Sequence, residues 1–139
     1  MNTQQATNKN SAPARRLTLL IADDDVDTVL TLAAIMRDDG HVVHTCANAN
    51  IVVEAIERHQ PDVCILDIVM PGRTGFSIVR EVLGKPLAKR PVMIALTGVF
   101  TKASDEIVAR TAGFDHFVRK GDAPDALLGL ISEIAGGRS

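Results

Sequence analysis

The sequence contains no tryptophan and no tyrosine, and aromatic residues make up only 3% of its 139 positions. A folded core must therefore be aliphatic, and the 46% share of hydrophobic residues is enough to form one. The formal net charge is −2, whereas a surface that follows nucleic-acid phosphates is usually clearly basic. No apolar stretch approaches the roughly 18 residues of a membrane span. The composition thus predicts a globular protein that binds neither nucleic acid nor membrane.

Cysteines and targeting signals are also sparse. Cys46 and Cys64 lie in apolar runs without CxxC spacing, which predicts buried, reduced thiols. The N-terminus has no apolar segment typical of a signal peptide, and we therefore expect a cytoplasmic protein. Residues 1–16 are polar and without periodicity, which predicts a disordered tail, and residues 136–139 form a second tail. The histidines show no metal-ligand spacing and are expected at ordinary surface or strand positions; they are His41, His44, His59 and His116.

Residues 17–135 alternate short apolar runs with amphipathic stretches, which predicts one domain. Strands are predicted over 17–22, 41–46, 62–67, 91–96 and 114–118. Helices are predicted over about 26–38, 48–59, 74–83, 102–112 and 122–135. Gly40 and Gly113 indicate helix ends, and Asn48 and Asp122 are candidate N-caps. Five such units in series predict an α/β fold, an open five-stranded parallel sheet with helices on both faces.

Polar and charged residues stand where four of these strands end. Asp23 and Asp24 follow the first strand, Asp67 ends the third, Thr97 follows the fourth and Lys120 follows the last. Open parallel sheets bind ligands at the carboxyl ends of their strands, so we expect these side chains to lie close together. Carboxylates in a partly desolvated pocket repel one another unless a hard cation lies among them. The set therefore suits a divalent cation and a phosphoryl group.

The same segments resemble the receiver domain of two-component response regulators, over about residues 17–135. The resemblance is carried by the acidic pair, LDIVMPGRTG at 66–75, ALTG at 95–98 and AGFDHFVRK at 112–120. It implies a flavodoxin-like (βα)5 fold with sheet order 2-1-3-4-5. It also implies a signalling domain, whose only chemistry is its own phosphorylation and dephosphorylation, and not a conventional enzyme.

The resemblance assigns roles to the strand-end residues. Asp67 would be the nucleophile that takes a phosphoryl group from a histidine kinase or a histidine phosphotransfer protein. The Thr97 hydroxyl and the Lys120 ammonium would stabilise the transferred oxygens. Because no output domain follows residue 135, we expect signalling through contact with another protein or onward transfer in a phosphorelay. A phosphorylation-dependent dimer is one form that such a contact can take.

A magnesium ion is the cofactor that the resemblance implies. Asp24 and Asp67 would ligate Mg²⁺ directly, Asp23 would act through water, and the backbone carbonyl of Val69 would complete the protein ligands. These assignments follow the family's pattern position by position.

Two departures from the family pattern bear on chemistry. Gly121 stands where the family usually has a proline, so the loop after Lys120 is expected to differ in shape. The positions two residues past Asp67 and two past Thr97 line the path of the attacking water in this family. Here they are Val69 and Val99, neither of which can orient a water, and we expect a long-lived aspartyl phosphate.

A phosphatase of the haloacid-dehalogenase class is the main alternative. Residues 25–29 (DVDTV) match its DxDx[TV] motif, with Asp25 as nucleophile, and residues 95–97 resemble its second motif. That scheme leaves Asp67 unexplained, and we instead expect Asp25 and Asp27 to cap the first helix. A third alternative is a receiver-like protein-binding module that is not phosphorylated.

Overall fold

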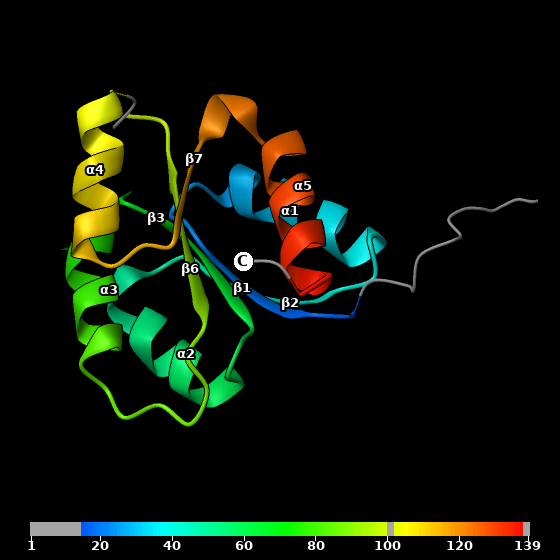
Figure 1. The fold of residues 1–139 in the computed structure, drawn as a ribbon, viewed down its shortest axis with the longest axis horizontal. Helices are drawn as coiled ribbons and strands as arrows, with labels where there is room; N and C mark the ends of the chain where they lie inside the picture. Colours follow the sequence, from blue (N-terminus) through cyan, green and yellow to red (C-terminus); the bar gives the residue numbers. More distant parts are fainter. Residues whose placement is uncertain (1–14, 100–101, 138–139) are drawn as a thin grey trace, which may run out of the picture.

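The computed structural model describes residues 15–99 and 102–137. Five parallel strands form one sheet in the order β2-β1-β3-β6-β7 (Figure 1). Numbered among themselves along the chain, these strands have the order 2-1-3-4-5, which confirms the predicted topology. Their bounds are β1 (Thr18–Ala22), β2 (Val42–Cys46), β3 (Val63–Asp67), β6 (Val92–Thr97) and β7 (His116–Arg119).

Helices cover both faces of the sheet, as predicted. On one face lie α1 (Val26–Asp38) and α5 (Asp125–Ala135), and on the other lie α2 (Val52–His59), α3 (Gly75–Leu83) and α4 (Ala103–Ala112) (Figure 1). Each face has its own aliphatic cluster, because successive side chains of the buried strands point to opposite sides. Within residues 15–99 and 102–137, no helix is long and apolar enough to cross a membrane.

Several local predictions are confirmed. Asp25 caps α1, and its side chain accepts from the backbone N–H groups of Asp27 and Thr28, whereas Asp27 lies in the first turn of the helix and is not its cap. Gly40 and Gly113 follow helices with φ of 98° and 129°, values that favour glycine. Both cysteines are buried and free.

A short hairpin after β3 was not predicted. It consists of β4 (Val69–Met70) and β5 (Arg73–Thr74), which pair antiparallel with Val69 opposite Thr74. Two-residue strands are too short to show a hydrophobic period, so periodicity gives no signal for them. The hairpin carries the chain from Asp67 directly into α3.

The prediction of the last helix was wrong at its start. A 3₁₀ turn, η2 (Lys120–Asp122), follows β7, and α5 begins at Asp125 with Pro124 as its N-cap. Asp122 is therefore part of the turn and does not cap the helix. At Gly121, an added Cβ would meet no atom of residues 15–99 or 102–137 within 4 Å, so no close packing among them requires glycine there.

The start of the second helix also differs from the predicted one. Asn48 is an N-cap, but of the 3₁₀ turn η1 (Ala49–Ile51), after which α2 begins at Val52. Residues 1–14 of the predicted N-terminal tail and residues 138–139 lie outside the described residues. Of the rest of that tail, the N–H of Arg15 donates to the Ala135 carbonyl, and Arg16 Nε donates to the Gly40 carbonyl at 3.0 Å.

Candidate functional site

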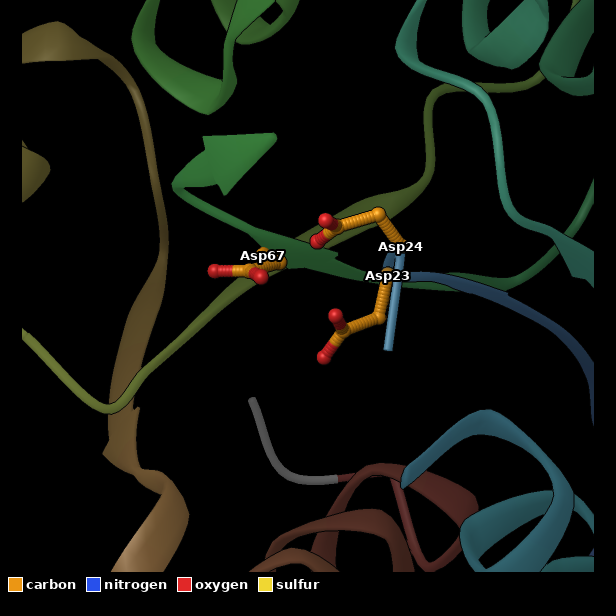
Figure 2. Close-up of side chains that lie close together, drawn as sticks. All are labelled: Asp23, Asp24 and Asp67. Carbon is orange, nitrogen blue, oxygen red and sulfur yellow. The ribbon is translucent and has the colours of Figure 1, made fainter. Parts of the chain in front are cut away.

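Three carboxylates converge at the carboxyl ends of two neighbouring strands. Asp23 and Asp24 follow β1, and Asp67 ends β3, which pairs with β1 in parallel register. Each side chain offers one oxygen, and the three oxygens lie within 4.8 Å of one another (Figure 2). Asp23 and Asp67 are buried, whereas Asp24 is exposed to solvent. Among the described residues, this is the only group of three or more potential metal ligands.

Lys120 reaches the two buried carboxylates from β7's carboxyl end. Its Nζ lies 2.7 Å from Asp23 Oδ2 and 3.3 Å from Asp67 Oδ2. The other oxygen of Asp23 accepts from the Asp25 N–H at 2.9 Å, which orients this carboxylate. The structure thus brings the predicted lysine into direct contact with both acids.

Asp67 lies in an environment that disfavours its charge. Burial and the neighbouring negative charge of Asp23 raise the pKa of Asp67 to about 6, against the opposing effects of the Val69 N–H and Lys120. The Val69 N–H donates to Asp67 Oδ1 at 3.1 Å. A cation placed beside this carboxyl group would stabilise its ionised form.

Lys120 shows the complementary effect. Burial alone would lower the pKa of its ammonium, but the contacts with Asp23 and Asp67 outweigh burial and raise that pKa. The lysine therefore stays charged and supplies a fixed positive charge beside Asp67.

Thr97 and Val69 complete the predicted set. Thr97 ends β6, the strand that pairs with β3, and it is fully buried. Its Oγ1 accepts from the Val99 N–H at 3.2 Å. Val69 begins the hairpin immediately beyond the acceptor strand, with its side chain 45% exposed. All six residues singled out from the sequence therefore lie at one edge of the sheet.

Gly75 is a site residue that the sequence analysis missed. An added Cβ at this position would lie 2.9 Å from both the Asp67 carbonyl oxygen and the Ile68 Cα. The Gly75 N–H also donates to the Ile68 carbonyl at 2.7 Å. Glycine thus lets the first turn of α3 pack on the backbone of the acceptor strand. The available signal was a glycine at the start of a predicted amphipathic helix.

The donors fit a hard divalent cation. The three carboxylates are oxygen ligands, with no sulfur or imidazole among them, and this is the set that Mg²⁺ prefers.

Asp25, the nucleophile of the phosphatase alternative, is fully engaged as a helix cap. Its carboxylate accepts from the Asp27 and Thr28 N–H groups and from the Thr28 hydroxyl. That alternative has no support in this structure.

The sequence profile of the response regulator receiver domain matches residues 19–132. The chain belongs to this family. Receiver domains are signalling domains and not conventional enzymes, and they generally bind Mg²⁺ at an acidic pocket. The family resemblance inferred from the strand-end motifs is therefore confirmed.

Individual relatives agree with this assignment. Protein PilH of Pseudomonas aeruginosa is 27% identical over 119 residues, which cover 86% of this chain and 98% of PilH. Transcriptional regulatory protein PdtaR of Mycobacterium tuberculosis is 32% identical over 68% of this chain and 46% of its own length. A response regulator from Chloroflexus aurantiacus superposes with a TM-score of 0.79 at 28% identity, covering 88% of this chain and 99% of that one.

Proposed function

We propose that this receiver domain accepts a phosphoryl group on Asp67 from the phosphohistidine of a histidine kinase or of a histidine phosphotransfer protein. The observation that supports it most strongly is the position of Asp67. It is a buried carboxylate at the carboxyl end of β3, with two further carboxylates and the Lys120 ammonium around it. This is the environment in which a carboxylate can act as a nucleophile toward phosphorus.

In the proposed transfer, an oxygen of Asp67 bonds to phosphorus while the bond between phosphorus and the imidazole nitrogen breaks. The imidazole is the leaving group, and the product is an aspartyl phosphate. Lys120 and the Thr97 hydroxyl are the donors that would stabilise the charge on the transferred oxygens. Both come from strand ends at the same edge as Asp67.

Mg²⁺, when bound, would supply positive charge that offsets the repulsion among the carboxylates and the phosphoryl oxygens. Asp24, Asp67 and the Val69 carbonyl would hold it, and Asp23 would act through water. The exposure of Asp24 leaves this side of the site open to solvent. Asp23, by contrast, is buried against Lys120, which agrees with an indirect role.

Signalling would follow from a shift between two conformations of the domain, over residues 17–135. We expect the output to be contact with another protein, including a second copy of this chain, or onward transfer of the phosphoryl group. We also propose that the protein acts in the cytoplasm, the compartment that its sequence led us to expect.

Intact mass after incubation with Mg²⁺ and a small phosphodonor tests the proposal. The wild type should gain the mass of one phosphoryl group, and Asp67→Asn should gain none. Asp38→Asn changes an exposed carboxylate at the end of α1 and should behave as wild type. A wild-type protein that gains no mass would instead favour a protein-binding module that is not phosphorylated.

A further inference from the structure

A groove with a cavity of about 480 Å³ lies between α3 and α4. The two helices are in contact, and Figure 1 shows α4 above α3 on the same side of the sheet. It is separate from the carboxylate site. Its walls include Phe76, Ser77 and Arg80 of α3 and Ile107, Val108 and Thr111 of α4.

The wall formed by α4 is unusually apolar for a surface. Ile107 is 66% exposed and Val108 is 52% exposed, and they are consecutive residues on one groove. Isolated exposed apolar side chains are common, but adjacent ones that line a hollow are typical of a binding surface. Burying these two side chains would contribute favourably to binding.

The charge at the groove is positive. Arg80 is its only charged lining residue, and it makes no ion pair with any residue in 15–99 or 102–137. The acids that adjoin Arg80 and Ile107 in sequence already have arginine partners. Glu81 lies 2.8 Å from Arg73, and Glu106 lies 3.1 Å from Arg110. A partner with a carboxylate would therefore meet a cation without a competing acid.

Both walls are connected in sequence to the phosphoacceptor site. Thr74, at the entrance of α3, lines the groove and pairs with Val69 of the hairpin that follows Asp67. On the other wall, α4 is the first helix after Thr97. A rearrangement of either strand end would therefore move a wall of the groove.

We propose that this groove docks an amphipathic helix of a partner protein, with its apolar face on Ile107 and Val108 and a carboxylate paired to Arg80. Helices laid into apolar grooves are a recurring recognition mode, and an arginine binds carboxylates bidentately. One unpaired cation is too little charge for a nucleic acid or an anionic membrane. The proposal names the output surface of the proposed function and in that respect rests on it.

Two synthetic helical peptides test the docking. Both carry leucines at i, i+3, i+4 and i+7; one has glutamates flanking this face, and the other has lysines at the same positions. Titration of the ¹⁵N-labelled protein should give saturable shifts in residues 74–80 and 107–112. The glutamate peptide should bind about tenfold more tightly than the lysine peptide. Shifts confined to α1 and α5, or no saturable binding at millimolar peptide, would overturn the proposal.

Charge reversal gives a matched control. Arg80→Glu should invert the preference between the two peptides. Arg90→Glu makes the same change at another exposed arginine, which lines a different surface pocket, and should leave the preference unaltered. Ile107→Ser should weaken the binding of both peptides. Leu30→Ser, at a position of similar exposure on α1, should weaken the binding of neither. Equal effects of the two arginine variants would contradict a groove-specific pairing.

Phosphorylation separates this proposal from the proposed function. Peptide affinity is measured before and after the phosphodonor, with intact mass read on the same sample. We expect at least a threefold change in affinity, about 0.7 kcal/mol, in wild type and none in Asp67→Asn. Mass gain without peptide binding overturns the groove alone. Peptide binding in a protein that gains no mass overturns the proposed function and leaves the groove standing.

Discussion

A methyl group on Gly75 would lie 2.9 Å from the carbonyl oxygen of Asp67. The first turn of α3 thus packs on the backbone that carries the phosphoacceptor, with no space for a side chain. We expect Gly75→Ala to lower the free energy of unfolding by about 1–3 kcal/mol, because backbone atoms cannot move aside as a flexible side chain can. We also expect it to slow phosphorylation, since the acceptor loop must shift. Urea denaturation and the rate of mass gain measure the two effects.

Gly129 provides the control for Gly75. It lies inside α5, where an added Cβ would meet no atom of the described part of the chain within 4 Å. Gly129→Ala should therefore be neutral or stabilise by up to about 1 kcal/mol, through helix propensity alone. A Gly75→Ala protein with the same stability and phosphorylation rate as Gly129→Ala would show that the close approach is unimportant.

Asp67→Asn should stabilise the protein without Mg²⁺. Because the pKa of Asp67 is raised to about 6 from 3.8, the folded protein holds a proton across that window that the unfolded chain releases. Stability therefore falls as pH rises through the window, and the loss persists at pH 7. The uncharged amide of Asp67→Asn avoids this loss and should raise the free energy of unfolding at pH 7 by on the order of 1 kcal/mol. Urea denaturation at pH 7 in EDTA checks this, and added Mg²⁺ should stabilise wild type more than the variant.

Asp62 should behave in the opposite way. Burial would raise the pKa of this carboxyl, but the Lys89 ammonium and the Thr18 N–H outweigh burial and lower it. Its charged form therefore stabilises the fold above its ordinary pKa, and Asp62→Asn should destabilise the protein at pH 7. If Asp62→Asn and Asp67→Asn changed the free energy of unfolding at pH 7 in the same direction, the electrostatic explanation would be refuted.

Magnesium affinity should depend on Asp24 far more than on Asp25. Asp24 belongs to the carboxylate cluster, whereas the side chain of Asp25 caps α1. We expect Asp24→Ala to weaken Mg²⁺ binding about tenfold or more, and Asp25→Ala to lower the stability of α1 with little change in metal affinity. Calorimetric titration with Mg²⁺ measures the first effect and thermal unfolding the second. Equal losses of metal affinity would place the cluster one residue further along the chain.

The strand-end residues could be predicted because parallel strands end at one edge. The period of the apolar runs located Asp23, Asp67 and Thr97 without any knowledge of contacts. Distances between side chains are different, because they depend on packing that no local pattern encodes. The sequence placed Lys120 at the site, but nothing in it indicated that the ammonium lies closer to Asp23 than to Asp67.

His41 is a second example of what local patterns miss. It was expected at an ordinary surface or strand position. The structure adds that it is buried and that its Nδ1 accepts from the Leu17 N–H at 3.1 Å. Leu17 immediately precedes β1, so this histidine fixes the entry to the central strands. Its partner is 24 residues away in sequence. Short-range periodicity carries no information at that separation.

Acid should destabilise the packing of β2 on α2. The rings of His44 and His59 stack with centroids 3.7 Å apart. Burial, the positive charge of His59 and that of Arg37 all lower the pKa of His44 from 6.5. The stack is therefore favoured with His44 neutral, and its contribution to stability is lost as pH falls below about 6.5. His44→Gln should show a smaller loss of stability than wild type between pH about 7.5 and about 5.5. Thr45→Val, an exposed neighbour without a titratable group, should keep the wild-type dependence.

The aspartyl phosphate on Asp67 should be long-lived, because the two side chains beside the site cannot orient a water. Val69 is 45% exposed and Val99 is 70% exposed, so both lie on the solvent side, where an attacking water must approach. Their backbone N–H groups are engaged by Asp67 Oδ1 and Thr97 Oγ1, which holds both valines close to the acceptor. An apolar side chain at these positions excludes water and offers it no hydrogen bond for in-line attack.

Val69→Asn with Val99→Glu supplies an amide and a carboxylate at the same positions and should speed dephosphorylation at least several-fold. The measurement is the decay of phosphorylated protein in excess Mg²⁺ after removal of the donor, with Val69→Leu and Val99→Leu as apolar controls that should decay no faster than wild type. Loss of the phosphoryl group from wild type within seconds, or equal decay in the polar and apolar variants, would show that these two residues do not limit the attack of water.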